Sequence, residues 1–157
     1  MKKLFHPTLL LVILSIVLMI SAACMPPATP VPPTAAPSNS IQNIVWQWTS
    51  VTNQTTQQTT TVSNPGNYTI VFYPDGKVSG AADCNTFTGT YSQENGFSIT
   101  IGATTMAACG DDSLDAQYLA LLGAVAAGGP DGTGGLALET AGGEQRMLFV
   151  DGGPATQ

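Results

Sequence analysis

The sequence predicts an α+β fold: a single small domain in which a curved, mainly antiparallel β-sheet packs against one α-helix. Three observations predict it. Short segments rich in β-branched and aromatic residues alternate with turn sequences. One apolar stripe with helical spacing follows most of these segments. About 110 residues, 41–151, are available for folding, which suffices for one modest domain.

The first predicted strand covers residues 41–51. It places Ile44, Trp46 and Trp48 at alternate positions, and therefore on one face of the sheet. We expect both indoles to face the core. The alternative is that Trp46 and Trp48 line an apolar ligand groove. The polar residues 52–67 then predict an exposed loop or an irregular sheet edge.

Two hairpins are predicted next. Residues 68–73, YTIVFY, lead through Pro74-Asp75-Gly76 into the returning segment KVSGAA. Residues 86–91 and 97–101 are joined by a connection that ends in Asn95-Gly96, and Asn-Gly between alternating segments is a strong hairpin signal.

A helix is predicted over residues 113–127. Its apolar side chains recur at helical spacing: Leu114, Tyr118, Leu121, Leu122 and Val125. Three residues at its start, Asp111, Asp112 and Ser113, offer capping oxygens. The sequence GGP at 128–130 should end the helix, and residues 128–135 predict a connection.

The last two predicted strands are LALET, residues 136–140, and RMLFV, residues 146–150. Residues 152–157 are expected to form a flexible tail.

The N-terminal residues 1–23 have the layout of a signal peptide. Two lysines precede an apolar segment, residues 9–20, and small residues follow it up to Cys24. This apolar segment is shorter than the ~20 residues that a helix needs to cross a bilayer. Small residues followed by cysteine resemble the bacterial lipobox, which implies lipidation of Cys24. Ordinary cleavage near Ala23 and an uncleaved anchor are the alternatives.

Residues 24–40 are expected to be a tether that starts at the lipidated cysteine. Six prolines and no charges occur in residues 25–40, a composition that favours an extended, solvated chain. After the leader, only Lys77 and Arg146 oppose ten acidic residues, a net charge of −8. Nucleic acid is therefore a poor partner, and an anionic membrane would repel the domain, so that lipid must hold it there.

The residue types exclude several chemistries. The single histidine, His6, lies in the leader, which excludes histidine-dependent nucleophilic catalysis and histidine-ligated metal in the mature domain. No catalytic residue, metal ligand or cofactor is predicted. Outside the cytoplasm we expect Cys84 and Cys109 to form a disulfide, and the alternative is two buried thiols that do not meet.

The middle of the chain resembles a known family. GKVSGAADCNTFTGTY and the later FSITIGATTMAAC resemble the META domain family, which includes the heat-shock protein HslJ. The anchors of this resemblance are Gly80, Cys84-Asn85, Gly89, Thr105-Met106 and Ala108-Cys109. It implies an incomplete barrel crossed by a helix, export or lipid anchoring, and a link to stress or antibiotic tolerance. It implies no agreed enzymatic activity and no catalytic residues.

These observations predict a monomeric lipoprotein on the extracytoplasmic face of a bacterial membrane, anchored through Cys24. Its expected role is non-catalytic: binding an envelope protein or small apolar ligand at the open side of the sheet, or supporting envelope stress tolerance. One alternative is a hydrolase that uses carboxylates alone. It would draw on Asp83, Glu94, Asp111, Asp112 and Asp115. Another is a peptide-gripping inhibitor or secretion-assisting module, which would present an exposed strand edge or a groove.

Overall fold

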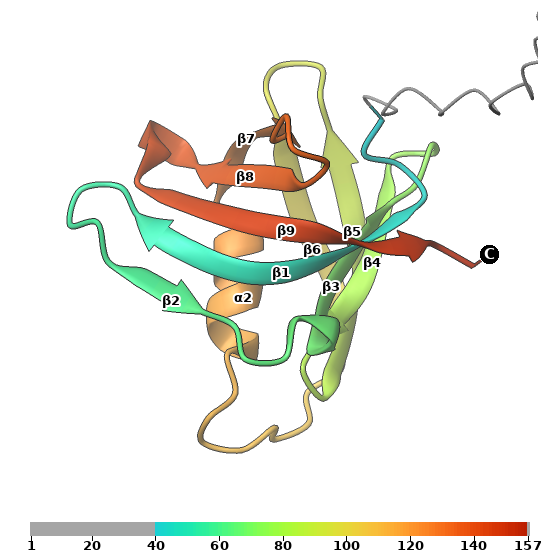
Figure 1. The fold of residues 1–157 in the computed structure, drawn as a ribbon. Helices are drawn as coiled ribbons and strands as arrows, with labels where there is room; N and C mark the ends of the chain where they lie inside the picture. The colour runs from blue at the N-terminus through green and yellow to red at the C-terminus, as the bar shows by residue number, and fades with distance from the viewer. Residues whose placement is uncertain (1–39, 157) are drawn as a thin grey trace, which may run out of the picture. The chain divides into compact units, whose positions relative to one another are not determined.

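The computed structural model describes residues 40–156, so the predicted leader, Cys24 and nearly all of the tether lie outside it. The described residues form a nine-stranded, curled antiparallel sheet and one α-helix (Figure 1). The elements are β1 (Ile44–Asn53), β2 (Thr59–Thr61), β3 (Tyr68–Phe72), β4 (Lys77–Ala82), β5 (Asn85–Ser92), β6 (Ser98–Thr104), α2 (Asp115–Gly123), β7 (Val125–Pro130), β8 (Leu136–Thr140) and β9 (Gln145–Pro154). The predicted α+β fold class is confirmed. No helix of the described part is long and apolar enough to cross a membrane.

Strand order follows the chain except at β1, which is central to the sheet. The strands lie in the order β6-β5-β4-β3-β1-β9-β8-β7, and β2 pairs with the C-terminal half of β1. The two predicted hairpins are present as β3–β4 and β5–β6. Because β1 pairs with β3, β2 and β9, it joins the two halves of the sheet.

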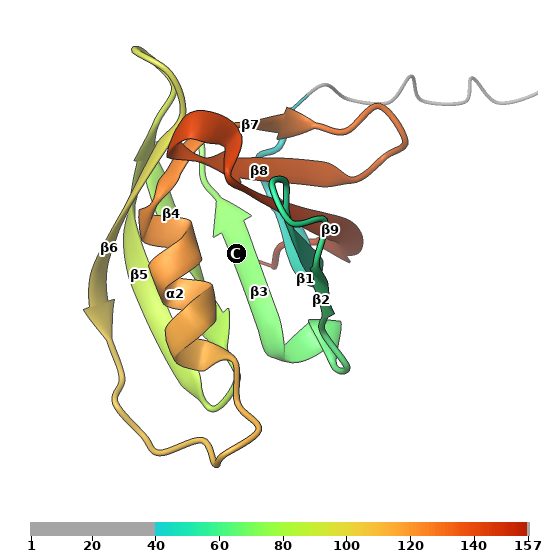
Figure 2. The same ribbon diagram turned by 90° about the vertical axis from the view of Figure 1, so that its left-hand side faces the viewer.

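The two outer strands of this order, β6 and β7, approach each other without closing the barrel. The backbone N–H of Phe97, just before β6, donates to the carbonyl of Ala126 in β7 at 3.1 Å. Further along β6, helix α2 stands inside the curve of the sheet, beside β4, β5 and β6 (Figure 2). The structure is therefore an incomplete barrel. Its two edge strands come together at one end, and helix α2 keeps them apart at the other.

The core joins the helix to the sheet through aromatic packing. Trp48 is fully buried and its ring stacks on Tyr118 of α2, with centroids 5.0 Å apart. Tyr68 meets both rings edge-on, at 5.7 Å from each. Such pairs add to the burial of large apolar area. The predicted inward orientation of Trp46 and Trp48 is confirmed, with 4% and 0% of their surfaces exposed.

Two anchors of the family resemblance are glycine for a steric reason. A Cβ on Gly80 would lie 1.9 Å from the Thr69 carbonyl oxygen, and one on Gly89 would lie 2.2 Å from the Thr100 carbonyl oxygen. Neither site can hold a larger side chain without moving backbone. At these two positions the backbone of the neighbouring strand, β3 beside Gly80 and β6 beside Gly89, lies too close for a side chain.

The helix is shorter than predicted at its C-terminal end. It stops at Gly123, and Val125–Pro130 forms strand β7 instead of the last helical turn and the start of a connection. Val125 is still buried, but β7 pairs along its length with β8. Ladder pairing with a buried strand outweighs the local helical preference of these residues.

Of the three predicted capping residues, only Ser113 bonds to the start of the helix. Leu114 occupies the N-cap position without a side-chain capping bond, and its backbone N–H donates to the Tyr68 hydroxyl at 2.9 Å. The hydroxyl of Ser113 accepts from the backbone N–H of Asp115 at 3.3 Å, whereas Asp111 and Asp112 make no cap. A core tyrosine thus satisfies a helix-start donor that sequence alone assigned to polar neighbours.

The polar residues 52–67 form the predicted irregular sheet edge, with the end of β1, the short exposed strand β2 and a 3₁₀ turn, Pro65–Asn67. One further boundary differs from the prediction. At the other end of the chain, β9 continues to Pro154, which pairs with Ile44, so residues 152–154 are strand and not tail. Both segments are polar or glycine-rich, and it is pairing with β1 that orders them.

Candidate functional site

The two cysteines of the domain are joined in the structure. The Sγ atoms of Cys84 and Cys109 lie 2.04 Å apart and their Cα atoms 5.4 Å apart, so the two form a disulfide. Cys84 belongs to the two-residue connection between β4 and β5, and Cys109 to the long connection between β6 and α2. The bond therefore fastens the loop before the helix to the sheet. Cys84 is exposed to solvent.

Asn85, next to the disulfide, is a buried polar side chain that holds the same loop. Its Oδ1 accepts from the Ala107 backbone N–H at 2.8 Å and from the Thr105 hydroxyl at 3.1 Å. Its Nδ2 donates to the Ala107 carbonyl at 3.1 Å and to Asp115 Oδ2 at 3.0 Å, and it lies 3.2 Å from Cys109 Sγ. Because these hydrogen bonds satisfy a side chain that is 3% exposed, Asn85 fixes the loop against both β5 and α2.

The loop fixed in this way forms one wall of a hollow that we call the β6–α2 groove. It is an open depression of about 700 Å³ between the C-terminal half of β6, the loop after it and the first turns of α2. Its surface is mostly apolar. It is lined by Asn85, Ile101, Gly102, Thr104, Thr105, Met106, Ala107, Ala108, Asp115, Ala116 and Leu119.

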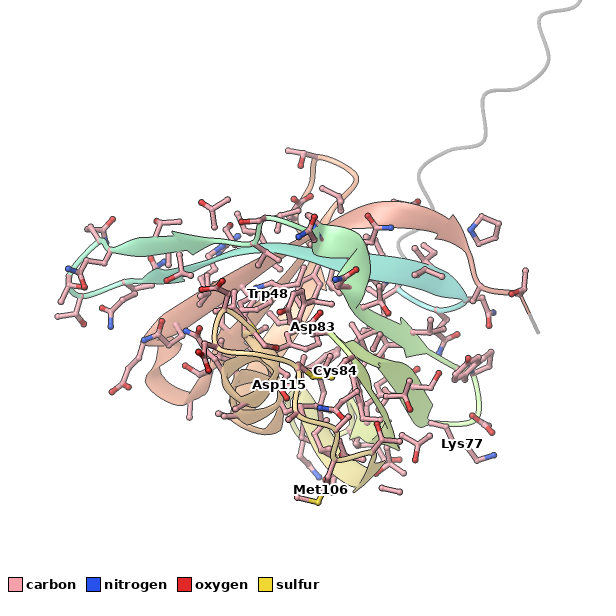
Figure 3. All side chains as sticks on the ribbon, turned by 90° about the horizontal axis from the view of Figure 1, so that it is seen from below. Trp48, Lys77, Asp83, Cys84, Met106 and Asp115 are labelled. Atoms are coloured by element: carbon pink, nitrogen blue, oxygen red, sulfur yellow. A yellow bond between two sulfur atoms is a disulfide. The ribbon has the colours of Figure 1, made fainter. Side chains whose placement is uncertain are left out.

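Met106 projects from the rim of this groove. It is 96% exposed, and Figure 3 shows it at the outer extreme of the loop, away from the rest of the domain. An unbranched, polarisable side chain in this position can adapt to differently shaped apolar surfaces. Met106 and Val150 are the exposed large hydrophobic residues of the described part of the chain, and Met106 is the one at the groove.

The tryptophan groove considered from the sequence is not present. Trp46 and Trp48 are buried, and their indole N–H groups donate to the carbonyls of Ile41 and Ser50, each at 2.8 Å. Neither residue lines the β6–α2 groove. Both side chains are satisfied within the core, and they support the fold instead of contacting a ligand.

The candidate acids of the hydrolase alternative do not gather in the β6–α2 groove. Asp115 alone of the five lines the β6–α2 groove, whereas Asp83 accepts a hydrogen bond from Asn67 Nδ2 at 3.1 Å, and Glu94 lies in the β5–β6 connection. Two other hollows carry one carboxylate each, from Asp75 and Glu144. Within residues 40–156, no three acidic, cysteine or histidine side chains are arranged to hold a metal ion.

A second hollow lies on the opposite face of the sheet, over β4 and β5. It encloses about 730 Å³ between Tyr73, Lys77 and Thr90, among others. Lys77 is already paired there with Asp75, and Tyr73 with the Ser79 hydroxyl at 3.1 Å. The β6–α2 groove is the better candidate, because the disulfide, the Asn85 network and the exposed Met106 all converge on it.

Sequence reasoning missed most of the groove, although signals for it were present. Asn85, Met106 and Ala108 were anchors of the family resemblance but had no assigned role. Leu119 lies outside the predicted apolar stripe of the helix. An apolar side chain on a second face of the helix was one of the signals for the groove. Ile101 was placed correctly in a strand, but no local pattern showed that this strand would be an edge beside the helix.

The fold and this site define a class: a small α+β domain with an incomplete barrel, one inserted helix and a disulfide-fastened loop. A family model for the META domain matches residues 39–152. The chain therefore belongs to the META domain family, as the resemblance of its central residues implies. A search of curated proteins found no significant match.

Two solved structures share the fold. An NMR structure of a protein from Burkholderia xenovorans superposes with a TM-score of 0.57 at 19% identity, covering 81% of this chain and 96% of that one. A crystal structure of a DUF4847 family protein from Bacteroides vulgatus gives a TM-score of 0.51 at 14% identity, covering 70% of this chain and 93% of that one. At such identities the likeness shows the fold alone.

Proposed function

We propose that this chain is an exported, lipid-anchored envelope protein whose META domain binds an apolar ligand, or an apolar segment of an envelope partner, in the β6–α2 groove. The observation that carries the proposal is the groove itself. Its lining is mostly apolar, and its shape is held by buried hydrogen bonds and a disulfide. A preformed apolar depression with a few fixed polar groups is the usual form of a ligand site.

The proposed export is supported by the chemistry of the cysteines and by the leader. A disulfide formed by a solvent-exposed cysteine such as Cys84 persists in an oxidising compartment and is reduced in most cytosols. The signal-like residues 1–23 and the cysteine at 24 would place the domain in such a compartment on a lipid anchor. A role in tolerance of envelope stress follows as part of the same proposal.

The groove is tested by photo-crosslinking in native membranes. A photoreactive residue at Ala116 lies in the groove, whereas the same residue at Gln117, its exposed neighbour on α2, lines a different hollow. We expect adducts at position 116 at least fivefold in excess of those at position 117, with mass spectrometry identifying lipid, small molecule or protein. Equal yields at both positions would contradict the proposal.

The anchor is tested separately with a palmitate analogue. Wild-type protein should incorporate the label and sediment with membranes, and Cys24→Ala protein should do neither. A Cys24→Ala variant that is labelled and membrane-bound as well as wild type would exclude lipidation at Cys24.

A further inference from the structure

Strand β6 has an unprotected edge beside the β6–α2 groove. Backbone groups alternate in direction along a strand. The Phe97 N–H points away from β5, toward Ala126, whereas the Thr100 carbonyl points at β5, where it lies against Gly89. By this alternation Ile101 directs its N–H and C=O away from β5, and no hydrogen bond within residues 40–156 engages them on that side.

The side chains of β6 do nothing to block this edge. Its sequence, SITIGAT, contains no charged residue and no proline, and Gly102 and Ala103 are exposed. Natural edge strands are usually kept short, charged, bulged, proline-containing or covered. By contrast, β7 ends in Pro130 and β2 has three residues. The pairing of β6 with β5 shifts register between Ile101 and Thr104, so the regular part of the free edge ends at Ile101. Up to that point neither a charge nor a proline prevents another strand from pairing with β6.

The charge of the domain selects among partners that could pair there. Residues 40–156 carry ten acidic side chains and two basic ones, and both basic residues are already paired, Lys77 with Asp75 and Arg146 with Glu139. Asp115 lines the groove itself. A second copy would bring like charges together, whereas a basic segment would be attracted. The chain's own residues 25–40 fit poorly, because six prolines remove donors and no charge is present.

We propose that the β6–α2 groove binds an extended basic peptide segment, which adds as a strand to the free edge of β6. Alternate side chains of the peptide would lie against Ile101 and Leu119, and its cationic residues would be attracted by Asp115 and by the net negative charge of the domain. This inference rests on the proposed function and specifies the class of its ligand.

The test uses the full-length chain in neutral detergent micelles and a fluorescein-labelled peptide, KVTVTVK, with fluorescence anisotropy as the readout. We expect saturable binding. A peptide with proline at its centre and one with glutamate at both ends should each bind at least tenfold more weakly. Equal binding of the proline peptide would overturn strand addition, and equal binding of the glutamate peptide would overturn the charge argument.

Two protein variants locate the peptide. Ala103→Lys places a cation on the exposed β6 edge, and Thr90→Lys makes the same charge change on the exposed outer face of β5. We expect Ala103→Lys to weaken binding at least tenfold and Thr90→Lys to change it less than twofold, with both far-ultraviolet spectra unchanged. Equal effects of the two variants would overturn the assignment to the edge.

Hydrogen exchange gives a readout independent of charge. Bound peptide should slow exchange in a proteolytic fragment that covers residues 98–104, and unchanged exchange there would overturn the inference. A dimer of the free protein that Ala103→Lys dissociates would also overturn it, by showing that the edge pairs with a second copy. Adducts at Ala116 without any peptide binding would leave the proposed function standing, whereas the absence of both would remove it as well.

Discussion

Single residues in this domain act through partners that are distant in sequence. Asn85 bonds to Ala107 and Asp115, which follow it by 22 and 30 positions. The alternation of Trp46 and Trp48 predicted their burial correctly, because strand periodicity is local. The role of Asn85 could not be predicted in that way, since it depends on where a long loop folds back.

Tyr118 offers the clearest test at the level of one atom. Its hydroxyl is buried and has no hydrogen-bond partner in the described part of the chain, and burial raises the pKa of its phenol well above the usual value. We expect Tyr118→Phe to leave the free energy of unfolding unchanged or to raise it by up to about 1 kcal/mol, because an unsatisfied polar group is removed.

Tyr68→Phe is the matched control, measured in the same urea titration. Its hydroxyl accepts the Leu114 backbone N–H at the start of the helix, so its loss should lower the free energy of unfolding by about 1 kcal/mol. A destabilised Tyr118→Phe protein would mean that the Tyr118 hydroxyl has a partner, such as a buried water.

At the scale of elements, the hairpins were predicted well and the end of the helix was not. Turn sequences such as Asn95-Gly96 act locally, so they specify a hairpin without knowledge of the rest of the fold. Residues 124–127 fit a helix locally, but β8, which pairs with β9 on one side, pairs with Val125–Pro130 as β7 on the other. The β6–α2 groove could not be predicted for the same reason, because it exists only where α2 meets an edge strand.

The β7–β8 connection depends on the carboxylate of Asp131. One oxygen accepts the Thr133 backbone N–H at 2.7 Å, the Thr133 hydroxyl at 2.9 Å and the Gly135 N–H at 2.9 Å. These bonds, the Thr133 backbone N–H foremost, lower the pKa of Asp131 below its usual 3.8. Asp131→Asn keeps the acceptor but removes the charge, and should lower stability at neutral pH by about 0.5 kcal/mol, since solvent screens the site.

The pH dependence of this difference follows from the sign of the shift. A carboxylate whose pKa is lowered in the folded state stabilises the fold at pH values above its pKa in the unfolded state. This stabilisation is lost as pH falls through the pKa of the folded state. The stability gap between wild type and Asp131→Asn should therefore be constant from pH 7 to about 5 and shrink below 3.8. A gap that persists undiminished to pH 2 would contradict this account.

The disulfide is the second feature that holds a connection between two elements. Its cysteines are 25 positions apart, and on the chain-entropy model opening such a loop costs about 3.5 kcal/mol. We expect the Cys84→Ser and Cys109→Ser double variant to fold but to lose roughly this amount, measured by urea unfolding against wild type without and with a reducing agent. Reduced wild type should match the double variant, and a gap between the two would point to effects of the serines themselves.

For the whole molecule, the fold class could be predicted because alternating strands and one amphipathic stripe specify what must be buried. The strand order could not, since β1 pairs with β9 across almost the full length of the domain. Non-local pairing of this kind has no signature in any short window of sequence.

The shared core predicts cooperative unfolding. Trp48 in β1 contacts Tyr118 of α2, and β1 pairs with both halves of the sheet. Tryptophan fluorescence and far-ultraviolet circular dichroism should therefore give coincident urea transitions. Separated midpoints would show that β7, β8 and β9 unfold apart from the rest.

The pairing of Ile44 with Pro154 brings the first and last strands of the domain together, and the Ala155 N–H donates to the Asn43 carbonyl at 3.0 Å. The chain thus enters and leaves the folded unit at neighbouring points. A unit with adjacent ends can be spliced into a surface loop of another protein without stretching its host, and its own ends can be joined and reopened elsewhere. The domain is consequently suited to insertion within larger chains as well as to attachment at the end of a tether.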